Sequence, residues 1–160
     1  FKYFENFLIV NGGKKSGIKE KMGLIGTKGV LGIVKNVTDN YATIRPLINP
    51  NFGLKVLHKK TNSWGDLTWI PEENNYENIY VKNIPIYTKV KAGDYFVTSG
   101  GEGLFPQGLK VGKVIQIKKN IEQQTLEIKL KNEEDFSSTK IGFVVFNKTA
   151  EEINQHLNKK

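Results

Sequence analysis

The chain has 160 residues, a formal net charge of +8 and no cysteine. This length allows one domain, or two small domains that share a core. The missing cysteine excludes disulfides, thiolate metal sites and a cysteine nucleophile, and no apolar run approaches the roughly 20 residues of a membrane-spanning helix. The sequence opens with Phe1-Lys2-Tyr3, without an initiator methionine and without the pattern of a signal peptide. We therefore expect a piece of a longer protein.

The positive charge comes almost entirely from lysine. Arg45 is the only arginine among 24 basic residues. Arginine makes the bidentate contacts to guanine and phosphate that specific nucleic-acid recognition uses, whereas lysines spread along a chain are more typical of a solvated surface. A basic module that binds nucleic acid or glycan remains the alternative interpretation, supported by the charge and the aromatic residues.

Short apolar or alternating segments recur along the chain, separated by turn residues and rich in β-branched and aromatic side chains. This pattern predicts an all-β protein. About eleven strands exceed what one small barrel needs, so we expect two small β-barrels packed together. The expected strands are Phe7–Val10, Met22–Gly26, Val30–Val37, Tyr41–Leu47, Leu54–Leu57, Leu67–Ile70, Ile79–Val81, Tyr95–Thr98, Val111–Lys118, Thr125–Leu130 and Ile141–Phe146.

The expected organisation is two barrels and a tail. Residues 1–47 would form the first barrel, with late strands within 111–147 available to complete it. Residues 48–147 would form the second barrel, and 148–160 a short C-terminal helix or tail. Thr149 and Glu152 fit a capping box at the start of that helix.

Two late segments have the alternation of a hairpin. Leu126, Ile128 and Leu130 should point inward, with Thr125, Glu127 and Lys129 pointing outward. In the preceding segment the pattern places Val114 and Gln116 on one face and Ile115 and Ile117 on the other.

The glycine-rich stretch TSGGEGLFPQG, residues 98–108, allows three interpretations. Ser99 lacks the first glycine of a nucleophile elbow, and the chain has only His58 and His156 to serve as a base. A phosphate cradle built on Gly100, Gly101, Gly103 and Gly108 would need a following helix, but a strand follows. We therefore favour a structural turn stiffened by Pro106, together with an earlier turn at Gly93-Asp94.

The remaining acids and histidines give no sign of a site. Glu72-Glu73 and Glu133-Glu134-Asp135 lie in polar loops, where acid runs are usually solvated. The two histidines have no close ligand spacing around them. We expect no catalytic residues, no cofactor and no metal.

Three aromatic residues are candidate partner contacts. Trp64 and Trp69 are separated by an odd number of positions, so a continuous strand would bury one and expose the other. An exposed tryptophan could stack on a base or sugar, or anchor a protein partner. Phe105 in the glycine loop either makes an apolar contact or folds back as a plug.

The order of these motifs resembles the extracytoplasmic domain of the MreC family of bacterial rod-shape-determining proteins. The resemblance rests on GDYFVTSGGEGLFPQGLKVGKV (93–114), KSGIKEKMGLIGTKGVLGIVKNV (15–37), IRPLINPNFGLKVLHKK (44–60) and the following WGDLTW. It covers about Phe7 to Phe146. The phrase from Lys15 to Gly26 and the tryptophan hairpin look most like the Bacteroidota branch.

The resemblance implies a non-enzymatic scaffold. Similar proteins are single-pass inner-membrane proteins with a coiled coil and a periplasmic domain of two small barrels. They organise and activate the enzymes that build the lateral cell wall. The implied partners are a class B penicillin-binding protein (a transpeptidase), MreD, MreB and further MreC copies, as a dimer or filament.

Overall fold

The computed structural model describes residues 7–136 and the backbone of 143–145. Within them lie eleven strands and two short 3-10 helices, which confirms the all-β class. The elements are β1 (Leu8–Asn11), η1 (Lys14–Ser16), β2 (Gly23–Ile25), β3 (Val30–Val37), β4 (Tyr41–Pro46), β5 (Leu54–His58), β6 (Trp64–Thr68), η2 (Pro71–Glu73), β7 (Asn78–Pro85), β8 (Tyr95–Thr98), β9 (Lys110–Asn120), β10 (Thr125–Asn132) and β11 (Phe143–Val145). The expected helix at Thr149 lies outside the described residues.

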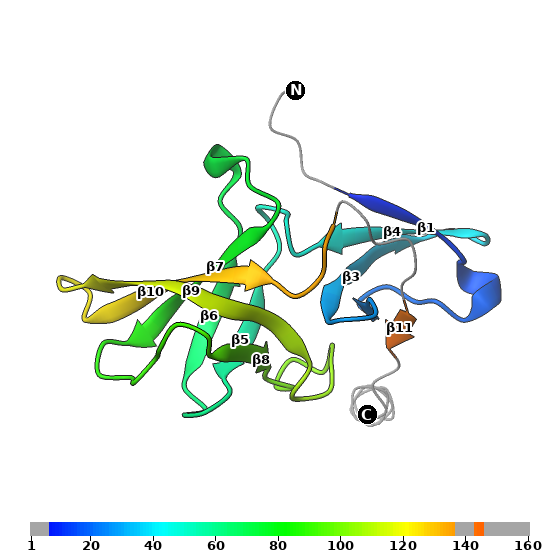
Figure 1. Cartoon of the computed structure of the whole chain (residues 1–160). Coiled ribbons are helices and arrows are strands. Elements are labelled where there is room, and N and C mark those ends of the chain that lie inside the picture. The colour runs from blue at the N-terminus through cyan, green and yellow to red at the C-terminus, as the bar shows by residue number, and fades with distance from the viewer. Residues whose placement is uncertain (1–6, 137–142, 146–160) are drawn as a thin grey trace.

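Six strands form a closed barrel in the order β10-β7-β6-β5-β8-β9 (Figure 1). All neighbouring pairs are antiparallel. Closure leaves no free sheet edge in this unit. Its interior is filled by branched and aromatic side chains from every strand, among them Val56, Leu67, Val81, Phe96, Val114 and Ile128.

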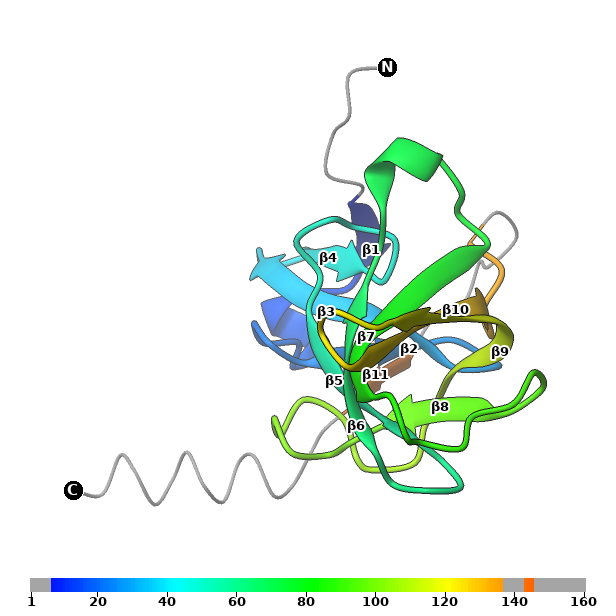
Figure 2. The same ribbon diagram turned by 90° about the vertical axis from the view of Figure 1, so that its left-hand side faces the viewer.

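The other unit is a five-stranded sheet in the order β1-β4-β3-β2-β11. In the described residues this sheet is open, with β1 and β11 as its outer strands. Of the two small barrels that we expected, the second is a closed barrel and the first is this open sheet. The late strand β11 pairs with β2, with Val145 opposite Gly23. Figure 2 shows the sheet behind the barrel when the barrel faces the viewer.

The β9–β10 hairpin departs from simple alternation at one residue. Leu126, Ile128 and Leu130 are buried, as expected. The register slips between the pairs Lys129–Gln116 and Leu130–Val114, so Ile115 is the extra residue of a bulge. A bulge breaks the two-residue period, so Ile115 and Gln116 are both exposed instead of facing opposite sides.

The sixth strand begins earlier than we expected. Trp64 is already paired with Leu57, and the strand ends at Thr68. The expected strand, Leu67–Ile70, lies too far toward the C-terminus. Gly65 and Asp66 interrupt the apolar pattern at the start of β6, so the pattern alone places the strand too late. Gly65 is required there, since an added methyl group would overlap Val81 and Ile84.

The two units share a seam, which is the contact between the β2–β3 hairpin and the barrel. Val30 of β3 belongs to the barrel core, and Ile25 and Ile33 pack against that core. On the barrel side, Phe105 lies against the backbone of Gly23 so closely that a methyl group there would overlap its ring. The seam is therefore a continuation of the barrel core into the first unit.

A carboxylate secures the turn of the same hairpin. Glu134, just after β10, accepts hydrogen bonds from the backbone N–H groups of Lys28 and Gly29 through Oε1, the latter at 2.8 Å. Gly26 leaves room for this carboxylate, and Gly29 lies against the carbonyl of Lys110. A buried carboxylate is stable here because backbone donors replace its lost water.

The seam predicts a large cost for one small substitution. Gly23→Ala should lower the free energy of unfolding by about 1–3 kcal/mol, because Phe105 and the loop carbonyl of Leu104 must move away. Urea unfolding at neutral pH measures this difference. Gly53→Ala is the matched control, since nothing lies within 4 Å of an added methyl group there. Equal stabilities for the two variants would show that Gly23 is not a tight contact.

Candidate partner-binding site

The glycine loop, residues 99–108, is fastened at its base by Thr98. The N–H of Thr98 donates to the carbonyl of Leu109 at 2.9 Å, and its carbonyl accepts from the N–H of Gly108 at 3.0 Å. Its hydroxyl donates to the carbonyl of Pro106 at 2.6 Å and accepts from the N–H of Leu109 at 3.0 Å. The main chain and the hydroxyl of one residue thus close the base of the loop where it leaves the barrel.

Three glycines of this loop adopt backbone angles that other residues avoid. The φ angles of Gly100, Gly103 and Gly108 are 75°, 71° and 97°. Glycine has no side-chain penalty in this region, so these positions permit the loop to turn. Gly101 has no such angle, but a methyl group there would touch the ring of Trp64.

Phe105 is buried, so it is not available to a partner in this structure. Its ring belongs to the barrel core and lies against Gly23 of the first unit. Of the two expectations for Phe105, the geometry is that of a plug. Burial is favoured because the ring fills the space between the two units.

The two tryptophans have opposite environments. Trp64 is 53% exposed, and a methyl group on Gly101 would lie 3.0 Å from its Cη2 atom. Trp69 is buried, donates from Nε1 to the carbonyl of Asn75 at 2.8 Å and stacks on Tyr76. Trp69 therefore packs beneath the loop that follows β6. Because it is buried, it is not available to a partner in this structure, and Trp64 is the tryptophan that remains as a candidate contact.

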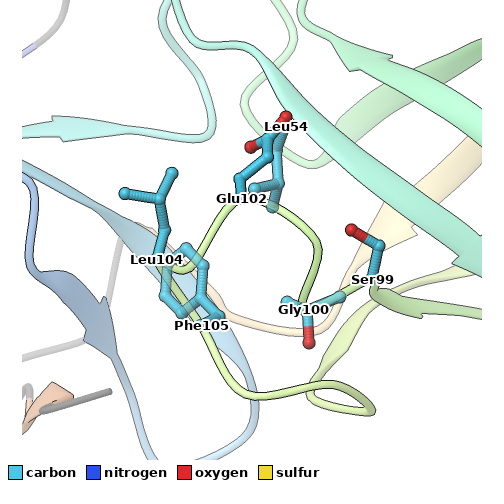
Figure 3. A pocket seen from close by; sticks show the side chains of 7 residues that line it. Leu54, Ser99, Gly100, Glu102, Leu104 and Phe105 are labelled. Carbon is cyan, nitrogen blue, oxygen red and sulfur yellow. The ribbon is translucent and has the colours of Figure 1, made fainter. Parts of the chain in front are cut away.

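A shallow hollow lies between the glycine loop and β5 (Figure 3). Its lining is Leu54, Thr98, Ser99, Gly100, Glu102, Leu104 and Phe105, and it encloses no space wide enough for a water molecule. Pockets for small molecules are usually about 300–1,000 Å³. The hollow is therefore a surface depression, too tight as it stands for a substrate, a cofactor or an inserted side chain.

Ser99 is not arranged as a nucleophile. It is buried, and its Oγ accepts a hydrogen bond from the N–H of Gly101 at 3.2 Å. The imidazole of His58 is occupied elsewhere: Nε2 lies 2.9 Å from Oδ2 of Asp94, and Nδ1 lies 2.7 Å from Oγ1 of Thr61. His156 lies outside the described residues.

The pair His58–Asp94 is a buried network that sequence reasoning missed. Both side chains are buried, and Lys60 adds an ion pair to Asp94 Oδ1 at 2.7 Å. The N–H of Lys91 donates to Asp94 Oδ2 at 2.9 Å. The network joins the turn after β5 to the turn before β8. The two turns are 36 residues apart in sequence, so no local pattern could have revealed it.

The carboxyl group of Asp94 is held ionised. Burial alone would raise its pKa, but the hydrogen bonds from Lys60, the backbone of Lys91 and His58 outweigh burial and hold the pKa well below its usual range. Asp94 was expected only as a turn residue next to Gly93, whose φ of 91° does make the turn.

Residues 7–136 contain no group of three His, Cys or acidic side chains that could hold a metal ion. In the same part of the chain, no helix has the length and apolarity to cross a bilayer. What the described surface offers is an exposed tryptophan, a shallow hollow and many lysines.

Asp94 gives a prediction with a defined pH dependence. Asp94→Asn should cost about 1–3 kcal/mol of stability at pH 7, because Lys60 and His58 lose a charged acceptor. The folded pKa is depressed, so this stability is present above the ordinary carboxyl pKa of about 4 and is lost as pH falls toward the lower folded value.

Urea unfolding of both proteins at pH 7 and at about pH 3 tests this. The difference between wild type and Asp94→Asn should shrink at the lower pH. Asp39→Asn, at an exposed position, should change little at either pH. A difference that grows on acidification would contradict the assignment of an ionised Asp94.

The geometry defines a class of protein before any relative is considered: a two-part β domain whose exposed features suit binding to another macromolecule. The chain belongs to the MreC family, because the family profile described as "Rod shape-determining protein MreC, barrel core" matches residues 1–146.

Two curated relatives and two solved structures are similar to the chain. The Cell shape-determining protein MreC of Escherichia coli (strain K12) is 25% identical over 116 residues, which is 72% of this chain and 30% of that protein. The protein of the same name from Listeria monocytogenes is 26% identical over 111 residues, covering 68% and 37%. The chain thus spans about a third of the length of these relatives.

The structural likeness is stronger than the sequence likeness. MreC from Pseudomonas aeruginosa has a TM-score of 0.83 at 18% identity, with 91% of this chain and 92% of that chain covered. A chain from a complex between Penicillin-Binding Protein (PBP2) and MreC from Helicobacter pylori has a TM-score of 0.67 at 20% identity, with 82% of each chain covered. At these identities the likeness establishes the fold.

Proposed function

We propose that this chain is the periplasmic domain of a non-enzymatic scaffold that organises and activates peptidoglycan synthases during cell elongation. The observation that carries the proposal is the match of residues 1–146 to the barrel core of MreC. A related structure is described as the major periplasmic domain of the cell shape-determining filament MreC, which supports the compartment. The rest of the protein would supply an inner-membrane helix.

The partner proposed first is a class B penicillin-binding protein. The Helicobacter pylori complex shows an MreC bound to PBP2, and a comparable partner here would be the elongation transpeptidase. A scaffold activates an enzyme only if it binds the active conformation more tightly than the inactive one. A difference of about 1–3 kcal/mol would change activity several-fold to about a hundredfold.

Trp64 is the residue that we assign to this contact. Aromatic anchors, tryptophan above all, dominate protein interfaces when they become buried. Trp64 is half exposed, yet its ring is already supported by Gly101. An ordered ring loses little conformational freedom on binding, so the side chain is suited to anchor a partner next to the shallow hollow.

A non-enzymatic role agrees with the arrangement of the polar side chains. Ser99 accepts a backbone hydrogen bond, while the imidazole of His58 is buried between Asp94 and Thr61. A nucleophile would need a base within hydrogen-bond reach. We further propose MreD, MreB and other copies of the chain as partners of the full-length protein, the last as a dimer or filament.

Trp64→Ala should weaken binding of the chain to the periplasmic part of the same organism's elongation transpeptidase. The expected loss is about 2 kcal/mol or roughly thirtyfold in Kd, as for an interface anchor. Titration of labelled chain with the transpeptidase measures it. Tyr41→Ala is the matched control, because Tyr41 is also 53% exposed but lies on the five-stranded sheet.

The outcomes separate the site from the function. Saturable binding with equal affinities for both variants would keep the scaffold and remove Trp64 from its interface. Absence of saturable binding at tens of micromolar, a threshold near −6 kcal/mol, would contradict a direct contact between this domain and the transpeptidase. Phe105→Ala is avoided as a binding variant because it opens the seam.

A further inference from the structure

The barrel has one wall with an unusual concentration of lysine. Four lysines of β9 and two of β10 stand against a single acid in these strands, Glu127. The term lysine wall is used below for five of them, namely Lys110, Lys113, Lys118, Lys129 and Lys131. The sixth, Lys119, is also exposed but lies opposite the buried Leu126.

The lysine wall contains a pair that does not favour folding. Lys113 of β9 lies directly opposite Lys131 of β10, and both side chains are exposed. Like charges in this cross-strand position destabilise a sheet. Within the described residues the lysine ion pairs are Lys55–Asp66 and Lys60–Asp94, neither of them on this wall. Such a pair is explained if an anionic partner neutralises it.

Tyrosine rings support the ammonium groups. Lys110 and Lys113 lie over the ring of Tyr95, with Nζ 4.6 and 5.9 Å from its centroid. Lys129 lies over Tyr80 at 6.0 Å. Cation–π contacts of this kind hold the charges against the barrel surface.

Exposed apolar side chains flank the lysine wall. The bulge leaves Ile115 46% exposed beside Lys113. At the tip of the hairpin Ile121 is 65% exposed. The N–H of Ile86 donates to the carbonyl of Gln124, which brings Tyr87, 83% exposed, next to that tip. Figure 1 shows the tip at the end of the barrel farthest from the five-stranded sheet.

We propose that the lysine wall and the hairpin tip dock onto an anionic phospholipid bilayer. Lysine is a hydrated point charge and suits the diffuse charge of a headgroup surface, whereas a discrete phosphate site favours arginine. Exposed isoleucine and tyrosine among basic residues are the side chains that enter the interfacial region.

The acids around the wall decide which part of it is most positive. Glu127 lies opposite Lys118, and Glu122 lies in the tip turn. Glu73 accepts the hydroxyl hydrogen bond of Tyr80, near Lys129, and Glu133 follows the end of β10. The group formed by Lys110, Lys113 and Lys131 has Glu133 beside it, because the N–H of Glu133 donates to the carbonyl of Val111 at 3.3 Å. Three lysines against this one acid leave the group positive.

The test is co-sedimentation of the whole chain with vesicles. We expect binding to vesicles with about one third phosphatidylglycerol, little binding to pure phosphatidylcholine, and a steep loss between about 50 and about 300 mM salt. The triple variant K110E/K113E/K131E should bind at least about tenfold more weakly. Reversing both Lys113 and Lys131 keeps a like-charged pair, but the two cation–π contacts to Tyr95 are lost, so the thermal unfolding midpoint should fall by about 2–8 °C. A variant that is still folded at the temperature of the binding assay keeps the comparison valid.

The control is K14E/K15E/K19E, three exposed lysines of the five-stranded unit. Three reversals remove six charges from +8 and leave +2 in either variant, so only position differs. The control should stay within about twofold of wild type. Equal losses in both variants, or no sedimentation with anionic vesicles at low salt, would overturn the proposal.

A second pair of measurements distinguishes a bilayer from other polyanions. I121S/Y87S should remove the part of vesicle binding that persists at high salt and leave weak binding to duplex DNA unchanged. If this variant binds vesicles as wild type does, and DNA competes fully at equal charge, the wall is a general polyanion site and the assignment to a bilayer is wrong. Both results are independent of transpeptidase binding.

Discussion

The close packing of the β2–β3 hairpin against the barrel is the constraint on which the rest of the structure depends. Three glycines allow it: Gly23 receives Phe105, Gly26 receives the carboxylate of Glu134, and Gly29 lies on the carbonyl of Lys110. A side chain at any of these positions would overlap the group that now lies there, so the hairpin or the barrel would have to shift. Because the seam continues the barrel core, the position of the first unit is fixed by the same apolar burial that stabilises the barrel.

The seam also gives the glycine loop two distinct sides. Its inner side carries Phe105 into the core, and its outer side supports Trp64 through Gly101. A loop that is fastened on one side can present a rigid surface on the other. The same turn that stabilises the fold therefore orders the tryptophan that we assign to partner binding, and a loop variant that loosens the seam would disturb both.

Apart from the start of β6, the strands could be predicted because each repeats a local pattern between turn residues, as Leu126, Ile128 and Leu130 illustrate. What could not be predicted depends on contacts distant in sequence. The bulge at Ile115 appears only in the pairing of β9 with β10, and the link from His58 to Asp94 joins two separate turns. The burial of Phe105 likewise depends on Gly23 of the other unit, which no pattern within residues 98–108 can show.

The strand order of the barrel determines how its two proposed surfaces relate. In the ring β10-β7-β6-β5-β8-β9, strand β6 is three positions from β9 in either direction. Trp64 on β6 and the lysine wall centred on β9 therefore belong to opposite sides of the barrel. A protein partner at Trp64 and a bilayer at the lysine wall would not compete for the same area. Binding of the domain to the bilayer would instead restrict the orientations in which the domain encounters its protein partner. This restriction raises the effective concentration of that partner.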